Sequence, residues 1–389
     1  MTMTMAFRVA TALVLTAGTT LHAGEEPGWP RFSWDTVPVC IHFGKRSGPL
    51  TQDELEFVAR TSNLVCLEKA HAMDRLGSTE KGIAHDAKRL KALNKNMKVL
   101  FYWNGVLNYP FFDAAKELRR HPTWTLRDKQ GNPIYKGGDK GGTEQYNLLD
   151  PGFREWWAAC AGKAVRESNC DGVFMDAVPQ VETRILRQLG GGAPTQRALS
   201  SAVVDMMKQA KAAMGKDGIL VYNGLRSHDR RTRPIGEKFL PFADGAMVEH
   251  FTAMGSTSKE AIASDIAMIA EAGKKRNILV VKGWPDPTFT WMNSTKMKLP
   301  AGVLAAEAKK KITFSLACFL LAAQEHSYFC YSWGYREMHC SLVEYPEFSR
   351  RLGRPKGDCT RDGWQFSRTF EHAAVWADVA KRTARIDWK

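Results

Sequence analysis

Short apolar runs alternate with amphipathic segments along most of the chain. Eight runs rich in Val, Ile, Leu and aromatic residues have the length and composition of buried strands. They lie at residues 37–44, 64–67, 98–103, 171–178, 218–223, 245–249, 278–282 and 328–331. Most are separated by segments with apolar residues at helical spacing, such as 181–214 and 258–274. Eight strands that alternate with helices predict an α/β fold, a (β/α)8 TIM barrel.

Two parts of the chain depart from this alternation. Residues 106–149 form a long excursion after the third strand, and their many aromatic residues predict an ordered loop over the barrel. Residues 351–389 contain turn residues and alternating runs, which predict a small C-terminal β appendage packed on the barrel. We therefore assign the barrel to residues 24–350. No Gly-x-Gly-x-x-Gly follows the first strand, which argues against a dinucleotide-binding fold.

The first 23 residues have the pattern of a secretory signal peptide. Arg8 supplies the positive charge, residues 9–21 are mostly apolar or small, and Ala23 offers a cleavage site. This apolar run is too short for a membrane span, and no later segment resembles a transmembrane helix. We expect the protein to be exported to the periplasm or the extracellular space after cleavage.

Composition and charge limit the classes of partner that the protein could bind. The 389 residues are 44% hydrophobic, which is ordinary for a globular protein, and their net charge is +14. The basic residues are scattered along the sequence, which favours a solvated surface over a nucleic-acid site. For an exported protein, an anionic polysaccharide is a more plausible partner than DNA. None of the eight cysteines forms a Cys-x-x-Cys pair, which argues against structural zinc. Cys340 and Cys359 are the first candidate for a disulfide bond. We expect neither a metal ion nor an organic cofactor.

Polar and aromatic side chains gather at the predicted strand ends. In a TIM barrel the active site forms at the C-terminal ends of the strands. Aromatic rings stack on the apolar faces of sugars, while amides and carboxylates bind hydroxyl groups, so these side chains predict a carbohydrate site. They are His42, Glu68, Lys69, Trp103, Asn104, Asp176, Tyr222, Asn223, Glu249, His250, Lys282, Trp284 and Trp333.

Asp176 and Glu249 are the predicted catalytic pair. Glycoside hydrolysis needs two carboxylates, one that protonates the leaving oxygen and one that attacks or activates water. Asp176, after the apolar run Val173–Met175, suits the nucleophile, and Glu249 suits the general acid/base if apolar neighbours raise its pKa. The structural alternatives are a helix cap for Asp176 and a salt bridge for Glu249. Glu68 and the adjacent Lys69 suit a structural or substrate-orienting ion pair.

Three segments carry a resemblance to a known family. Residues 171–176, 121–131 and 147–157 resemble a hypothetical glycosyl hydrolase family of exported bacterial TIM-barrel proteins, distantly similar to endo-α-1,4-polygalactosaminidases. The resemblance implies a nucleophile on strand four, which matches Asp176, and a second acid on strand six, which matches Glu249. Many relatives have Asp at the second position, so the resemblance specifies the acid/base less closely.

These observations leave three hypotheses for function. The first is a secreted glycoside hydrolase that cleaves a polysaccharide or oligosaccharide by a two-carboxylate, retaining mechanism without a cofactor. The second is a catalytically inactive barrel that binds glycans. The third, a metal-dependent hydrolase or lyase using His42, Glu68 and Asp176, is weaker because no His-x-His or His-Glu-x-x-His spacing supports a metal centre. The sequence contains no Gly-x-Ser-x-Gly motif, which argues against a hydrolase with a serine triad.

Overall fold

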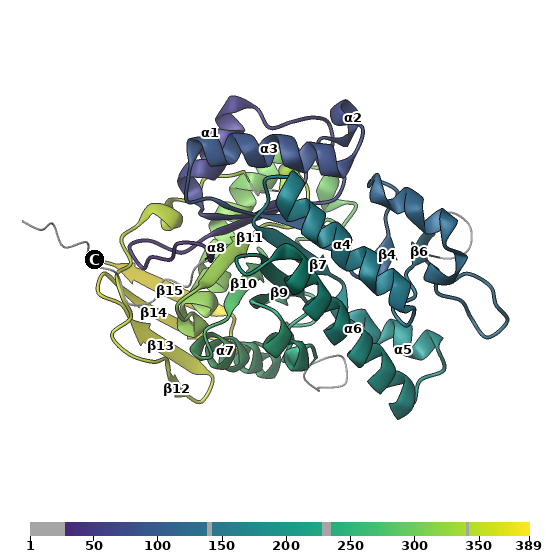
Figure 1. The fold of residues 1–389 in the computed structure, drawn as a ribbon. Coiled ribbons are helices and arrows are strands. Elements are labelled where there is room, and N and C mark those ends of the chain that lie inside the picture. Colours follow the sequence, from purple (N-terminus) through teal and green to yellow (C-terminus); the bar gives the residue numbers. More distant parts are fainter. Residues whose placement is uncertain (1–27, 138–141, 228–234, 340–341) are drawn as a thin grey trace, which may run out of the picture.

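Eight parallel strands form one sheet that closes on itself. The structure is a computed structural model that describes residues 28–137, 142–227, 235–339 and 342–389. A backbone bridge between Val39 and Phe329 joins the last strand to the first, and Figure 1 shows helices around the sheet. The predicted (β/α)8 barrel is therefore confirmed. In spatial order the strands are β1 (Cys40–Phe43), β2 (Leu64–Leu67), β3 (Lys98–Asn104), β7 (Gly172–Asp176), β8 (Ile219–Asn223), β9 (Gly245–Phe251), β10 (Ile278–Gly283) and β11 (Ser327–Tyr331).

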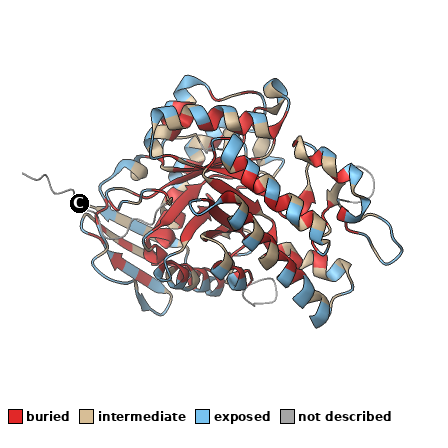
Figure 2. Ribbon diagram, viewed as in Figure 1, coloured by how far each residue is buried: buried red, intermediate tan, exposed pale blue. Residues whose placement is uncertain are grey.

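The strands are buried on both faces, as their apolar sequences require. Figure 2 shows the barrel strands almost entirely buried and the outer faces of the helices exposed. Two strands start with a glycine because the neighbouring backbone is too close for a side chain. A Cβ atom at Gly172 would lie 2.0 Å from the carbonyl oxygen of Ile219, and one at Gly245 would lie 1.9 Å from that of Ile278.

Six long helices cover the barrel, and hydroxyl or carboxylate side chains cap several of their N-termini. Thr51, Ser78, Asp150 and Ser258 each accept a hydrogen bond from a backbone N–H in the first turn of the helix that follows. The long helices are α1 (Gln52–Thr61), α3 (Thr79–Leu93), α4 (Pro151–Glu167), α6 (Ala193–Met214), α7 (Lys259–Lys274) and α8 (Ala301–Ala322), with the short helices α2 (Met73–Leu76) and α5 (Arg184–Gln188) between them.

One predicted helix is divided. The sequence predicts a single helical segment over 181–214, but α5 ends at Gln188 and α6 begins at Ala193. The intervening residues Gly190, Gly191 and Gly192 have φ angles of +86°, +71° and +88°. A right-handed helix cannot pass through this left-handed conformation, so the glycines end one helix before the next begins.

The excursion after β3 is ordered in its described parts, as its aromatic content predicts. It contains a small antiparallel sheet in the order β4-β6-β5 and 3-10 turns at Ala114–Arg120 and Pro122–Trp124. Figure 1 shows this segment beside α4, away from the C-terminal sheet. Its strands are β4 (Leu107–Asn108), β5 (Tyr135–Lys136) and β6 (Thr143–Gln145).

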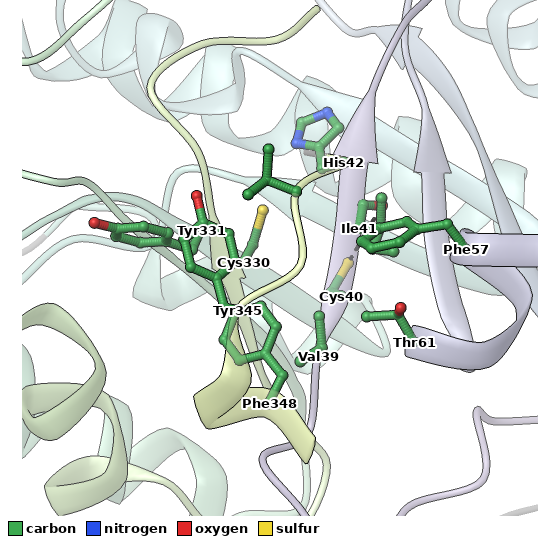
Figure 3. Close-up of a pocket in the computed structure, with 11 residues that line it drawn as sticks. Val39, Cys40, Ile41, His42, Phe57, Thr61, Cys330, Tyr331, Tyr345 and Phe348 are labelled. Carbon is green, nitrogen blue, oxygen red and sulfur yellow. Dashed lines mark hydrogen bonds between the residues drawn. The ribbon is translucent and has the colours of Figure 1, made fainter. Parts of the chain in front are cut away.

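A small cavity lies beside the seam between β1 and β11 (Figure 3). It measures about 10 Å³, the size of a single water site. Its wall includes Ile41 from β1, Val39 just before that strand, Phe57 from α1, and Tyr345 and Phe348 from the segment after β11. These side chains fill the outside of the seam, where a single bridge joins the two strands.

The C-terminal residues form a four-stranded antiparallel sheet that packs on α8. Buried and exposed residues alternate along β13, as expected for a sheet with one face covered. Arg368 on this strand is 4% exposed, and its guanidinium donates to the carbonyl oxygens of Leu320 and Ala323 at the end of α8, at 3.1 and 2.5 Å. The sheet therefore caps a barrel helix. Its strands are β12 (Thr360–Asp362), β13 (Gln365–Thr369), β14 (Ala373–Asp378) and β15 (Thr383–Trp388).

Replacing Arg368 with Met should destabilise the protein by about 2–4 kcal/mol, because buried carbonyl oxygens lose charged donors. Denaturant unfolding followed by circular dichroism measures the change. Arg385→Met is the matched control on β15, since the Arg385 side chain is 68% exposed. It should change the free energy of unfolding by less than about 0.5 kcal/mol. Equal effects of the two substitutions would contradict the capping role.

Several predictions fall outside the described residues. The proposed signal peptide, residues 1–23, lies there, and so does Cys340 of the candidate disulfide. The seven described cysteines have free thiols. In the described part of the chain, no helix is long and apolar enough to cross a membrane.

Candidate active site

Two carboxylates and two amides meet at the C-terminal end of the barrel. Asp176 ends β7 and pairs in register with Asn104, which ends β3. Asn223 ends β8, and Glu249 lies near the end of β9. Asp176 and Glu249 are partly exposed, whereas Asn104 and Asn223 are 2% and 5% exposed. The two carboxylates are therefore accessible at the end of the barrel that carries active sites in this fold.

Asp176 is held by four hydrogen-bond donors. Its Oδ2 accepts from the hydroxyl of Tyr102 at 2.5 Å and from Nδ2 of Asn104 at 3.1 Å. Its Oδ1 accepts from Nδ2 of Asn223 at 2.8 Å and from the backbone N–H of Ala177 at 2.7 Å. Ala177 has a φ of +70°, an unusual conformation for a residue with a side chain. The chain thus turns sharply after the strand, and the carboxylate is fixed in one orientation.

Glu249, like Asp176, accepts a hydrogen bond from a tyrosine, and it also lies beside a histidine. Its Oε1 accepts from the hydroxyl of Tyr335 at 2.5 Å, and its Oε2 lies 3.3 Å from Nε2 of His250. Nη2 of Arg226 lies 3.9 Å from Oε2 of Glu249, and the side chain of Asn223 also hydrogen-bonds this carboxylate. The backbone carbonyl of Glu249 accepts from the indole N–H of Trp284 at 2.8 Å.

A β-bulge explains how neighbouring residues of one strand reach the same site. Side chains normally alternate between the two faces of a strand. Between Val248 and Phe251, however, β9 takes three steps while β10 takes two. The extra residue falls at Glu249–His250, and a bulge redirects side chains locally. His250 therefore lies against the carboxylate of Glu249.

Asn223 joins the two carboxylates. Its amide nitrogen donates to Asp176, and its side chain also hydrogen-bonds Glu249, so the carboxylates lie on either side of one amide. Each carboxylate is close enough for its charge to act on the other. Burial and then the charge of Glu249 raise the pKa of Asp176. Burial also acts to raise the pKa of Glu249, but His250, Tyr335 and Arg226 lower it to about 2.

The pair Glu68–Lys69 lies beside Asp176. Glu68 is 3% exposed and binds Nζ of Lys69 at 2.6 Å and Nε2 of His42 at 2.9 Å. Lys69 Nζ also lies 4.5 Å from the centre of the Tyr102 ring. Glu68 is thus a buried, paired carboxylate, which fits the structural one of the two roles considered for this ion pair and leaves Glu68 no exposed surface for a substrate. No group of three or more His, Cys, Asp and Glu side chains in the described chain is arranged to hold a metal ion.

Two of the predicted substrate-binding residues point away from the carboxylates. Trp103 and Tyr222 immediately precede Asn104 and Asn223, so they face the opposite side of their strands. The ring of Trp103 packs against Phe112 and the tryptophans of α4, and the Tyr222 hydroxyl donates to a backbone carbonyl at Gly236. The structure therefore corrects both predictions.

Three further predicted residues are buried supports. Lys282 does not reach the carboxylate pair, because its Nζ donates to Ser332 Oγ and Gly334 O, both at 2.8 Å. Lys282 also lies 4.4 Å from the centre of the Tyr335 ring, so it positions that tyrosine. Trp284 and Trp333 are 1% and 0% exposed, so neither offers a free ring face to a sugar. Of the predicted substrate-binding residues, Lys69, Asn104 and Asn223 adjoin the carboxylate pair.

The sequence interpretation assigned no role to four residues that contact the pair. Tyr102 could have been found, since it lies two residues before Asn104 and shares its side of the strand. His250 reaches the site through the bulge, and Arg226 and Tyr335 come from segments after β8 and β11. Strand periodicity carries no signal for these three.

Comparisons with known proteins identify the family. Residues 91–374 match the family described as hypothetical glycosyl hydrolase family 15. No curated protein sequence matches this chain.

Several solved structures have a similar shape at low sequence identity. Alpha-L-fucosidase isoenzyme 2 from Paenibacillus thiaminolyticus is 13% identical, with a TM-score of 0.49, and the match covers 81% of this chain and 48% of that one. This chain thus spans about half the length of the fucosidase. TtGalA, an alpha-galactosidase from Thermus thermophilus, is 14% identical over 92% of this chain and 68% of that one, with a TM-score of 0.47.

A variant of the glycoside hydrolase domain of PelA from Pseudomonas aeruginosa is also similar. It is 12% identical over 77% of this chain and 99% of that one, with a TM-score of 0.46. The family match rests on sequence and covers most of the chain, from α3 through the barrel to β14. The protein belongs to hypothetical glycosyl hydrolase family 15 and is built on a TIM barrel.

Proposed function

We propose that the protein hydrolyses O-glycosidic bonds of a polysaccharide or oligosaccharide with retention of configuration, using Asp176 as nucleophile and Glu249 as general acid/base. The observation that carries the proposal is the arrangement of two partly exposed carboxylates on either side of Asn223 at the C-terminal end of the barrel. A pair of carboxylates flanking the scissile bond is what this chemistry requires.

The reaction would proceed in two steps. An oxygen of Asp176 attacks the anomeric carbon while the bond to the leaving oxygen breaks and Glu249 donates its proton to that oxygen. Attack replaces one of the four hydrogen bonds that Asp176 accepts. Glu249 then takes a proton from water, the resulting hydroxide oxygen bonds to the anomeric carbon, and Asp176 is released. Two inversions at one carbon give net retention.

The pKa order and the hydrogen bonds favour opposite role assignments. The raised pKa of Asp176 and the low pKa of Glu249 would place the proton of the pair on Asp176, and they do not meet the predicted condition of a raised pKa at Glu249. Yet each oxygen of Asp176 already accepts from two donors, so a proton on Asp176 would require the Tyr102 hydroxyl to change from donor to acceptor.

Glu249 differs from Asp176 because it has a neighbour that can accept a proton. Burial lowers the pKa of His250 to about 4, so its ring is neutral near pH 7 and one of its nitrogens is an acceptor. In the tautomer with the hydrogen on Nδ1, a protonated Glu249 donates to Nε2. We assign the roles from these hydrogen bonds, and substrate binding must then raise the pKa of Glu249 for it to act as the acid.

Charge around the pair supports an anionic glycan as substrate. Lys69 lies against the ring of Tyr102, which donates to Asp176, and Arg226 lies 3.9 Å from Glu249. Closely spaced cations favour a negatively charged ligand. Together with the net charge of +14 and the signal-like N-terminus, this supports export and action on an acidic or sulfated polysaccharide.

A substrate panel with a stereochemical readout tests the proposal. The panel combines aryl glycosides with polygalacturonate, hyaluronan, alginate, dextran sulfate, starch and dextran. We expect cleavage of at least one member, and proton NMR of the first product formed should show the anomeric configuration of the substrate. An inverted first product would contradict the assigned mechanism. Binding of panel members without any cleavage would favour a glycan-binding barrel instead.

A further inference from the structure

A second cavity lies in the excursion between β3 and β7. It measures about 610 Å³, within the range of ligand-binding pockets. Its wall comes from the end of β4, the segment that follows β4, and the β5–β6 pair. Among its lining residues are Tyr109, Phe111 and Tyr135, all partly exposed.

Two of these aromatic rings have the arrangement that a sugar ring can use. Tyr109 and Phe111 are stacked with their centres 5.9 Å apart and their planes 9° apart. Both rings line the cavity and remain partly exposed, although the guanidinium carbon of Arg46 lies 5.7 Å from the centre of the Phe111 ring. The C–H face of a pyranose ring packs on such surface, and its hydroxyl groups need polar partners at the edge.

The edge of the cavity supplies those polar partners. Asn108 donates to Glu144 at 3.0 Å, and both line the cavity. Lys116 and Arg119 provide positive charge. Lys116 is paired with Asp113 at 2.7 Å, whereas Arg119 is exposed and has no ion pair among the residues that the structure describes. Arg119 can therefore bind an acidic substituent without giving up another partner.

Tyr109 connects this cavity to the catalytic pair. Nζ of Lys69 lies 5.4 Å from the centre of the Tyr109 ring and 4.5 Å from that of Tyr102. Tyr102 in turn donates to Asp176. A chain of three contacting side chains therefore separates Asp176 from the cavity, so a substrate cleaved at Asp176 can extend toward it.

We propose that this cavity is a binding subsite for a sugar unit of the substrate that is not itself cleaved, with Tyr109 and Phe111 as the stacking surface and Arg119 as the contact for an acidic group. The inference rests on the proposed hydrolysis at Asp176 and Glu249. It implies that the substrate is an acidic glycan of several units, because an aryl monoglycoside cannot reach both places.

Substrate length provides the test. The probes are the polysaccharide that the wild-type protein cleaves, its hexamer and the aryl glycoside of the same sugar. Phe111→Ala and Arg119→Ala should each lower kcat/KM for the hexamer about tenfold and leave the aryl glycoside unchanged. The Arg119→Ala effect should shrink at high salt, where exposed charges are screened. Equal losses on both substrates, or no loss on the hexamer, would overturn the subsite.

The adjacent Arg120 gives a matched control. It is exposed, pairs with Glu117 at 3.0 Å and lines a different cavity, so Arg120→Ala should behave as wild type. Circular dichroism should show that all variants fold.

Affinity electrophoresis separates failure of the subsite from failure of the proposed hydrolysis. The inactive Asp176→Asn protein is run through gels that contain each polysaccharide of the panel. Retardation by an acidic polysaccharide that Phe111→Ala abolishes supports the subsite even if nothing is cleaved. Retardation by none of the polysaccharides, or retardation that Phe111→Ala leaves intact, overturns it.

Discussion

Replacing either carboxylate of the proposed catalytic pair should abolish most of the activity. We expect Asp176→Asn to lower kcat by at least about 10⁴-fold, since no group remains to form the glycosyl-enzyme bond. We expect Glu249→Gln to lower kcat by about 10²–10⁴-fold on substrates with a poor leaving group, because it removes acid catalysis. For an aryl glycoside with a good leaving group, Glu249→Gln should lower kcat by a smaller factor. Initial-rate measurements on both substrate types check this.

Azide distinguishes the two roles. In Glu249→Ala, added azide should attack the glycosyl enzyme and give a glycosyl azide of retained configuration. In Asp176→Ala, azide should occupy the place of the lost carboxylate and give the inverted product. The exchanged pattern would show that Asp176 is the acid, as the pKa order in the unliganded site suggests. Asp171→Asn is the control, since Asp171 lies just before the opposite end of β7 and pairs with Lys91.

Removing Lys69 should cost the largest amount of stability. Lys69→Met leaves Glu68 buried without its cation, which should lower the free energy of unfolding by about 3–5 kcal/mol. Adding Glu68→Gln to Lys69→Met should restore most of the loss, because the uncompensated charge is gone. Lys91→Met is the control, since the Lys91–Asp171 pair is partly exposed and should contribute less than about 1 kcal/mol. Denaturant unfolding of the four proteins gives the comparison.

The same pair makes stability depend on pH. Although burial acts to raise it, the charge of Lys69 and the hydrogen bond from His42 lower the pKa of Glu68 to about 2, from an ordinary value of 4.5. A depressed folded-state pKa stabilises the protein above the unfolded pKa, and this contribution is lost as the pH falls toward about 2. The difference between wild type and Lys69→Met should therefore shrink from pH 7 to pH 3. A constant difference would contradict the ion pair.

The barrel could be predicted because its signal is local and repeated. Apolar strands of four to seven residues recur between helices, and both Asp176 and Glu249 follow apolar runs near strand ends. Parallel strands bring such residues to one end of a barrel without further information. That is why two positions 73 residues apart in the sequence could be paired before the structure was known.

The rest of the site depends on features that periodicity does not encode. Strict alternation of side chains along β3 would have predicted Tyr102 as a site residue in place of Trp103. Along β9, however, it would have placed Glu249 and His250 on opposite faces, whereas the bulge brings them together. Tyr335 comes from the segment after β11, whose position depends on Lys282. Aromatic residues at strand ends were interpreted as sugar platforms, yet Trp284 and Trp333 are buried supports. Exposure of a side chain is a tertiary property, so the residue type alone could not decide this.

Covalent trapping tests the catalytic role of Asp176 and Glu249 most directly. The Glu249→Gln protein is mixed with an activated fluoro-sugar of the cleaved glycan, quenched in acid, digested and analysed by peptide mass spectrometry. We predict one modified peptide, with the sugar attached to the carboxylate of Asp176. Attachment to another carboxylate, or the same labelling in Asp176→Asn, would contradict the assignment.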